Sequence, residues 1–175
     1  QDYGVATTTT VASGGTQTVY AGGTANGTIL NGGHQTVAVS GTASGTTINS
    51  GSVQYDYGTA SGTTVNSGGI QKDYGAAVGT TLVGGVQYDY GTASGTTLSG
   101  GIQVVSGTAT STTISSGTQQ DYGVATTTTV ASGGTQNEYA GGTAKGTILN
   151  GGNQTVAASG TASGKTINSG REQYD

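Results

Sequence analysis

The chain contains no cysteine, proline, methionine, tryptophan or phenylalanine, and these absences exclude several classes of protein. Without cysteine there is neither a disulfide scaffold nor a thiolate metal site. Leu, Ile and Val together are 26 of 175 residues, which is below the roughly 20% expected for an ordinary globular core. No apolar run approaches the about 20 residues that a membrane-spanning helix needs. The composition therefore excludes a conventional α/β enzyme domain.

Charge is also scarce: Lys and Arg total 4, Asp and Glu total 8, and the formal net charge is −4. Nucleic-acid binding needs a stripe of cations that displaces counterions, and four cations cannot form one. An anionic membrane surface is disfavoured for the same reason. We therefore expect no nucleic-acid partner and no direct insertion of this segment into a membrane.

Gly, Ser and Thr are abundant, 88 of 175 residues, and they lie in a repeat. Ala recurs at a fixed place in each repeat, and the fifth residue after each of these Ala is always Val, Ile or Leu. One unit cannot bury one Ala and one aliphatic side chain alone, whereas a stack of units can. A second marker is Gln, at spacings of 16 to 19 residues: Gln17, Gln35, Gln54, Gln71, Gln87, Gln103, Gln119, Gln136, Gln154 and Gln173.

The spacing from each Gln to the next marker Ala is 6 or 8 residues and never 7, which indicates strands. A strand alternates its faces with period 2, so an insertion of two residues keeps every side chain on its side. Frequent Gly disfavours helices, and Thr and Val suit strands. We therefore predict an all-β fold with one domain over residues 1–175: a single-stranded parallel β-helix (β-solenoid) of about ten coils of 16–19 residues.

Further details follow from the same repeat. A column of Ala should face a column of Val, Ile and Leu, and stacked Gln amides should form a hydrogen-bonded ladder along the axis. The longer spacing predicts a larger loop or bulge after Gln17, Gln35, Gln136 and Gln154.

Residues 1–56 match residues 120–175 at an offset of 119, which is seven coils, with eight differences. None of the differences falls on the Ala or aliphatic columns. An unpaired buried charge is very costly, so positions that gain a charge should contact water. The charges gained in the second copy are Glu138, Lys145, Lys165, Arg171 and Glu172.

Candidate catalytic and metal-binding residues are few. His34 is the only histidine, and Asn153 takes its place in the second copy, so we interpret it as an exposed polar loop residue. The segment 160–166, GTASGKT, lacks the first Gly of a phosphate-binding loop. We predict no catalytic residue, no metal ligand, no cofactor and no enzymatic activity.

Four acidic residues lie two positions after a Gln and directly before a Tyr: Asp56, Asp73, Asp89 and Asp121. In a stack they form an acidic column beside an aromatic column. Such a surface could hold sugars by stacking or hold a cation loosely. The interpretation that we favour is that both residue types decorate an outer strand, with the Tyr rings shielding the ladder.

The repeat unit, as in SGGTQTVYAGGTANGTILNGG at residues 13–33, resembles known adhesin repeats. Its motifs are G-G-x-Q and A-x-G-T-x-x-x-x-G-G, the latter as in residues 60–69. The resemblance is to the passenger-domain repeats of self-associating bacterial autotransporter adhesins, the O-heptosylated AIDA-I/TibA-like group, and it covers essentially the whole chain.

The resemblance implies a right-handed coil and an internal passenger fragment, displayed on a Gram-negative cell surface and tethered to the outer membrane in the full-length protein. It implies adhesion, autoaggregation, biofilm formation and virulence. The implied partners are a second copy of the chain, an autotransporter heptosyltransferase that modifies Ser and Thr, and a host cell-surface receptor or glycan.

The resemblance does not identify individual glycosylation sites, and our hypothesis is that serines next to turns are modified first. The candidates after an Ala are Ser44, Ser61, Ser94 and Ser163. The candidates before a Gly are Ser13, Ser50, Ser67, Ser132 and Ser169.

Two other functions remain as alternatives. Flat Thr arrays on a β-solenoid suit ice binding, and pairs such as Thr63 and Thr64 or Thr80 and Thr81 would contribute to one. Adjacent residues, however, cannot both lie on one flat face. A β-helical enzyme that cleaves polysaccharides would need acids and bases clustered in a groove, and the sequence shows no such cluster.

Overall fold

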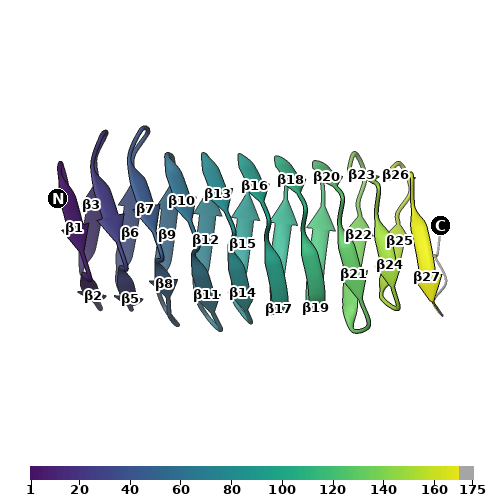
Figure 1. The fold of residues 1–175 in the computed structure, drawn as a ribbon, viewed down its shortest axis with the longest axis horizontal. Coiled ribbons are helices and arrows are strands. Elements are labelled where there is room, and N and C mark those ends of the chain that lie inside the picture. Colours follow the sequence, from purple (N-terminus) through teal and green to yellow (C-terminus); the bar gives the residue numbers. More distant parts are fainter. Residues whose placement is uncertain (170–175) are drawn as a thin grey trace.

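The structure of the chain is a computed structural model that describes residues 1–169 (Figure 1). These residues form 27 strands and no helix. Each strand pairs in parallel with the corresponding strand of the next coil, and ten coils stack into one elongated rod with the first and last strands at opposite ends (Figure 1). The predicted parallel β-solenoid is confirmed.

Three strands make up most coils, so the rod has three columns of strands. The first column is a 10-stranded sheet: β1 (Val5–Thr7), β4 (Thr24–Asn26), β7 (Thr42–Ser44), β10 (Thr59–Ser61), β13 (Ala76–Val78), β16 (Thr92–Ser94), β18 (Thr108–Thr110), β20 (Val124–Thr126), β23 (Thr143–Lys145) and β26 (Thr161–Ser163).

The second and third columns together form a 17-stranded sheet. The second column contains β2 (Thr10–Ala12), β5 (Ile29–Asn31), β8 (Thr47–Ile48), β11 (Thr64–Asn66), β14 (Thr81–Val83), β21 (Thr129–Ala131), β24 (Ile148–Asn150) and β27 (Thr166–Ser169). The third column contains β3 (Thr16–Val19), β6 (His34–Val37), β9 (Val53–Asp56), β12 (Ile70–Asp73), β15 (Val86–Asp89), β22 (Gly134–Glu138) and β25 (Asn153–Val156). Two long strands belong to both columns: β17 (Thr97–Val105) and β19 (Thr113–Asp121).

We number the coils from the N-terminus by their first-column strands, so β1 opens coil 1 and β26 opens coil 10. The turn after each first-column strand needs a left-handed residue, which Gly27 supplies in coil 2 at a φ of 66°. Ser111 takes the equivalent position in coil 7 at a φ of 57°, and Thr127 does so in coil 8 at 58°. The repeat therefore tolerates a strained non-Gly residue in some coils.

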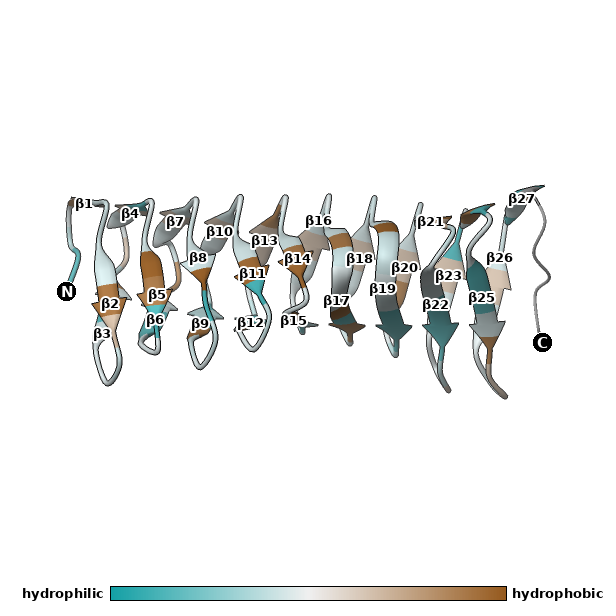
Figure 2. Ribbon diagram, turned by 90° about the horizontal axis from the view of Figure 1, so that it is seen from below, coloured by the Kyte–Doolittle hydropathy of each residue, from teal (hydrophilic) through white to brown (hydrophobic). Residues whose placement is uncertain are grey.

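The interior contains the two predicted apolar columns. Ala60 and Val65 are both 0% exposed, and the register aligns Ala with Ala from coil to coil. The hydropathy colouring shows the aliphatic column as brown bands on strands such as β2 and β5 (Figure 2). The aliphatic column is one continuous cluster: Val11, Leu30, Ile48, Val65, Leu82, Leu98, Ile114, Val130 and Leu149.

The Gln ladder is present along the described coils, inside the rod. The side-chain amide of Gln71 donates to the Oε1 atom of Gln54 at 2.9 Å, and the Gln87 amide donates to Gln71 at 3.0 Å. A column of buried Thr side chains supports the ladder, since the Thr80 hydroxyl donates to the same Gln71 oxygen at 3.1 Å. Hydrogen bonding satisfies these buried polar groups, which are costly when left without a partner.

Two kinds of corner follow the third-column strands. The long corner of coil 2 is a turn in which the backbone N–H of Gly41 donates to the carbonyl oxygen of Ala38 at 2.8 Å. In the short corner of coil 3, the N–H of Gly58 donates to the Oδ1 atom of Asp56 at 3.0 Å. Long corners lie where the spacing predicts them, in coils 1, 2, 8 and 9.

Two predictions about the interior are wrong. Asp56, Asp73, Asp89 and Asp121 do not decorate the outside of the rod, because all four are 0% exposed. Each lies two residues after an inward Gln, and residues two apart in a strand share a face. The prediction that charged substitutions contact water also fails at Glu138, which is 1% exposed. Arg171, Glu172 and Gln173 lie outside the described residues.

Candidate functional surface

The first group of candidate glycosylation sites forms a turn row. Ser13, Ser50, Ser67 and Ser132 lie in the turns between second- and third-column strands, and all four are exposed. Each packs against the neighbouring coil at a Gly, as Ser50 does at Gly68 and Ser67 does at Gly84. A side chain at those Gly positions would crowd the serine, so the glycines keep the hydroxyls accessible.

The second group forms a sheet row. Ser44, Ser61, Ser94 and Ser163 are the last residues of first-column strands and lie on the outside of the 10-stranded sheet. Ser44, Ser61 and Ser94 are half-buried between neighbouring strands, whereas Ser163 is exposed. The Ser44 hydroxyl donates to the Oδ1 atom of Asn26 and is therefore already engaged. Ser169 ends β27, and its side chain lies outside the described part of the chain.

Seven further serines are accessible that were not among the predicted candidates. Five of them also precede a Gly, so the rule used for the turn row would have found them if it had been applied throughout. Ser52, in contrast, precedes a Val and is buried, where its Oγ atom accepts a hydrogen bond from the N–H of Gly32 at 2.8 Å. The additional exposed serines are Ser40, Ser99, Ser106, Ser111, Ser115, Ser116 and Ser159.

The aromatic column lies at the corner of the rod, with the Tyr rings outside. The rings of Tyr57 and Tyr74 stack with centroids 4.9 Å apart, and those of Tyr74 and Tyr90 at 5.0 Å. Tyr122 and Tyr139 form a second stack at 4.6 Å. Tyr74 has both ring faces covered, and each ring at the end of a stack has one face covered. The stacks therefore leave few open ring faces for sugars.

The buried acids differ electrostatically from ordinary carboxyl groups. Burial raises the pKa of Asp56 to about 6, opposed by hydrogen bonds from the N–H groups of Gly58 and Ala60. Burial raises the pKa of Asp73 to about 8, and the neighbouring charges of Asp56 and Asp89 add to the rise. Because solvation favours the charged form, a carboxyl group removed from water keeps its proton to a higher pH.

The remaining acids follow the same pattern. Burial raises the pKa of Asp89 to about 7 and that of Asp121 to about 8. Both side-chain oxygens of Asp89 are buried without a hydrogen-bond partner, as is the Oδ2 atom of Asp73. Burial also raises the pKa of Glu138. The interior column therefore holds protonatable groups at neutral pH.

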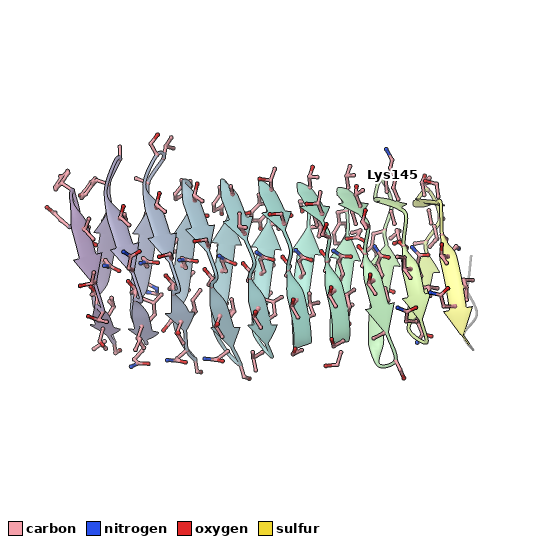
Figure 3. All side chains as sticks on the ribbon, in the orientation of Figure 1. Lys145 is labelled. Atoms are coloured by element: carbon pink, nitrogen blue, oxygen red, sulfur yellow. The ribbon has the colours of Figure 1, made fainter. Side chains whose placement is uncertain are left out.

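Other polar residues singled out in the sequence lie apart from one another. His34 lies on the outer face of strand β6, not in a loop as expected, and is half-buried. Lys145 is exposed and projects from the edge of the rod, as expected (Figure 3), whereas Lys165 is half-buried. In the described residues no three or more His, Cys, Asp or Glu side chains are placed to hold a metal ion.

The adjacent Thr pairs divide between the two faces of a strand, as expected. Thr63 and Thr80 are buried, whereas Thr64 and Thr81 lie on the outer face and are half-buried. Each pair thus contributes one outward hydroxyl.

These features define the class: an elongated repeat stalk with a packed interior and hydroxyl-rich outer faces. No helix among residues 1–169 is long and apolar enough to cross a membrane.

Comparisons with known proteins agree with this class. The family described as "Adhesin of bacterial autotransporter system, probable stalk" matches residues 2–52. A crystal structure of a TibA fragment, hyper-glycosylated by TibC catalysis, is 36% identical and covers 99% of this chain and 82% of that one, with a TM-score of 0.59. No curated protein sequence matches the chain. The chain belongs to the family of AIDA-I/TibA-like autotransporter adhesin repeats, as the resemblance in its sequence indicates.

Proposed function

We propose that this adhesin passenger segment promotes adhesion, autoaggregation and biofilm formation at the bacterial surface, and that it accepts heptose on outward Ser and Thr side chains. The observation that carries the proposal is the similarity, over 99% of this chain, to a TibA fragment that was hyper-glycosylated by TibC. The accessible rows of hydroxyls on this rod support it. Tethering to the outer membrane in the full-length protein belongs to the same proposal.

The glycosylation step is a transfer to oxygen. A serine Oγ atom attacks C1 of a heptose activated as a nucleoside diphosphate, and a new C1–O bond forms. The bond from C1 to the diphosphate breaks, the nucleoside diphosphate leaves, and the hydroxyl proton passes to a base on the transferase. The acceptor contributes only an exposed hydroxyl with room around it.

The turn row meets this requirement better than the sheet row. Ser50 and Ser67 are exposed and lie beside glycines, whereas Ser61 and Ser94 are half-buried between neighbouring strands. We therefore propose that the turn row is modified before the sheet row. Interactions between glycosylated rods then require no pocket, because many weak contacts add along the length of the rod.

The experiment is co-expression with an autotransporter heptosyltransferase, followed by intact-mass measurement and peptide mapping. The turn-row variant Ser13→Ala/Ser50→Ala/Ser67→Ala/Ser132→Ala should lose more mass than the matched sheet-row variant Ser44→Ala/Ser61→Ala/Ser94→Ala/Ser163→Ala. Equal losses would contradict the order of modification, and an unmodified wild-type chain would contradict the acceptor role.

Adhesive function is tested on cells that display the chain. Settling of the bacteria and their binding to cultured host cells should increase relative to cells without the chain, and should change when the transferase is omitted. Cells that settle and attach no faster than the empty control would refute adhesion and autoaggregation.

A further inference from the structure

The outward face of the third strand column differs between the centre of the rod and its ends. In coils 3 to 6 its first outward position is occupied by Val53, Ile70, Val86 and Ile102. Its second outward position is occupied by Tyr55, Lys72, Tyr88 and Val104. We call these eight side chains the central patch.

The central patch is continuous across the four coils. Ile70 pairs in register with Val53 on one side and with Val86 on the other, and Val86 pairs with Ile102. The corner rings of Tyr57, Tyr74 and Tyr90, which are between 43% and 48% exposed, extend the apolar surface beyond the patch in coils 3 to 5.

The same positions are polar in the other described coils. Coil 1 has Thr16 and Thr18 there, and coil 2 has His34 and Thr36. Toward the other end the two positions hold Thr118 and Gln120, Thr135 and Asn137, and Asn153 and Thr155. Both types of residue are therefore compatible with the fold at this face, so folding alone does not explain why the centre is apolar.

The area of the patch follows from strand geometry. Four strands spaced about 4.8 Å apart, each spanning three residues with a rise of about 3.3 Å per residue, cover roughly 200 Å². The corner rings raise the area to roughly 300 Å². This area equals the lower end of the range for the largest apolar patch on a typical monomer, and such patches are often functional.

The low charge of the surface favours a second copy of this chain as the partner. Of the eight acidic residues in the sequence, five are buried: Asp56, Asp73, Asp89, Asp121 and Glu138. The central patch itself carries one charge, Lys72, whose Nζ atom lies 5.6 Å from the centre of the Tyr55 ring. Two such surfaces meet with little like-charge repulsion, which is the main force that keeps soluble proteins apart.

We propose that the central patch docks against the central patch of a second copy of this chain. This inference rests on the proposed autoaggregation and names the face that performs it. Both copies present the same surface, as in a two-fold symmetric contact, with Tyr rings and aliphatic side chains from each copy covering those of the other. Lys72 of each copy then lies among aromatic rings, which attract cations.

The size of the patch sets the strength of the contact. A stable interface buries about 800 Å² on each partner, well above the roughly 300 Å² available here. A single pair of rods is therefore weakly associated and dissociates in dilute solution. Rods crowded on two facing surfaces form many contacts at once, and the summed affinity holds the surfaces together.

The test uses unglycosylated rods coupled to beads, so that glycans do not contribute. The patch variant is Tyr55→Thr/Val86→Thr/Tyr88→Thr/Ile102→Thr, which installs a residue that coils 1, 2 and 7 already carry at these positions. The control variant is Thr16→Ser/Thr18→Ser/Thr135→Ser/Thr155→Ser, which alters the same face outside the patch. Wild-type and control beads should cluster, and patch-variant beads should cluster at least about tenfold less, because contacts multiply on a bead.

Mixed beads test whether the contact needs the patch on both copies. Wild-type beads mixed with patch-variant beads should form no mixed clusters. Mixed clusters as large as the wild-type clusters would overturn the patch-to-patch contact, and so would unchanged clustering of the patch variant. A second variant, Thr118→Ile/Gln120→Tyr, extends the patch into coil 7 and should increase clustering. If the patch variant does not fold, this variant tests the proposal in its place, and clustering that does not increase would overturn the patch-to-patch contact.

The two proposals fail in different ways. If bacteria displaying the patch variant aggregate as strongly as those displaying the wild type, the central patch is not the docking face and autoaggregation stands. If bacteria displaying the wild-type chain do not aggregate at all, the proposed function itself is wrong.

Discussion

Coils 1 and 2 and coils 3 to 5 share three columns of strands and one ladder of Gln side chains, yet they differ at the inward position just before the corner. Val19 and Val37 occupy this position in the first two coils, and Asp56, Asp73 and Asp89 occupy it in the next three. All five side chains are 0% exposed. The comparison shows that the interior accepts a carboxyl group where a branched aliphatic also fits.

The corners explain how the carboxyl groups are accommodated. Val37 precedes a long corner that closes through backbone groups, whereas Asp56 and Asp73 precede short corners. There the Oδ1 atom of each Asp accepts a hydrogen bond from the N–H of the Gly two residues later, at 3.0 Å. A side chain that bonds to its own backbone two residues on is a common way for Asp to build a tight turn. Each of these Asp side chains still has one oxygen without a partner.

The largest expected effect is a pH dependence that originates in the acidic coils. Because the folded pKa values of Asp56, Asp73 and Asp89 are raised, the folded chain holds more protons than the unfolded chain between about pH 4 and pH 8. Their stabilising contribution is therefore complete below pH 4 and is lost as the pH rises through 6 to 8. We expect on the order of 5 kcal/mol less stability at pH 8.5 than at pH 5, or a Tm lower by about 10–20 °C.

Thermal melts across pH 4 to 9, at constant ionic strength, measure this effect. A Tm that rises or stays level over that range would show that the buried carboxyl groups are ionised without penalty.

Replacing the three acids by Val should make coils 3 to 5 resemble coils 1 and 2 at this inward position. The variant Asp56→Val/Asp73→Val/Asp89→Val should be about 1–4 kcal/mol more stable than the wild type at pH 8, because packed aliphatics commonly replace buried charges without loss. At pH 4.5 the gain should vanish, since the wild-type carboxyl groups are then neutral. Denaturant unfolding at both pH values measures the difference.

The matched control is the variant Asp56→Asn/Asp73→Asn/Asp89→Asn, which keeps an acceptor for the Gly N–H but cannot ionise. It should lose the share of the pH dependence that these three residues contribute, whereas Asp121 and Glu138 keep theirs. A control that titrates like the wild type would assign the dependence to other groups.

The converse substitution places an acid at the inward position of coil 2, which holds Val. Val37→Asp places a carboxyl group before a long corner, where no short-corner Gly N–H receives it. We expect a loss of about 3 kcal/mol at pH 8 and a smaller loss at pH 5, because burying an ionised group without partners is costly. Val105→Asp is the control, since coil 6 has a short corner, and its loss should be smaller. Equal losses would show that the corner does not matter.

The smallest effect concerns the aromatic stack that accompanies the acids. Tyr74 stacks on Tyr57 and on Tyr90, and Tyr74→Ser should cost about 1–2 kcal/mol through the loss of two ring contacts. Ser106 already occupies the equivalent corner position in coil 6, so the change is compatible with the fold. Tyr139 has one stacking partner, Tyr122, so Tyr139→Ser should cost about half as much. A Tm unchanged by either substitution would assign the stacks no stabilising role.

Much of the fold could be predicted because the repeat carries its own internal checks. The even spacing from Gln to Ala revealed strands, and the aliphatic at the fifth position identified the core, as the burial of Ala60 and Val65 confirms. Both inferences depend only on the alternation of faces, which a parallel stack preserves from coil to coil.

The four Asp residues were predicted to lie outside because the cost of burying a charge was given more weight than the alternation of faces along the strand. Gln71 and Asp73 are two residues apart and therefore share a face, and Val37 and Val105 occupy the same position in other coils. That pattern was a readable signal for an inward carboxyl group. What no pattern supplies is the shift in pKa, because it depends on neighbouring coils brought together only in the fold.

The offset of 119 residues between the duplicated segments brings coil 8 into the structural role of coil 1. Unequal exchange between these segments would insert or delete whole turns of the spiral without creating a misfit at either junction. Each such event would change the reach of the stalk by seven coils, about 34 Å. Recombination between the two copies is thus a means of changing the length of this rod by whole turns.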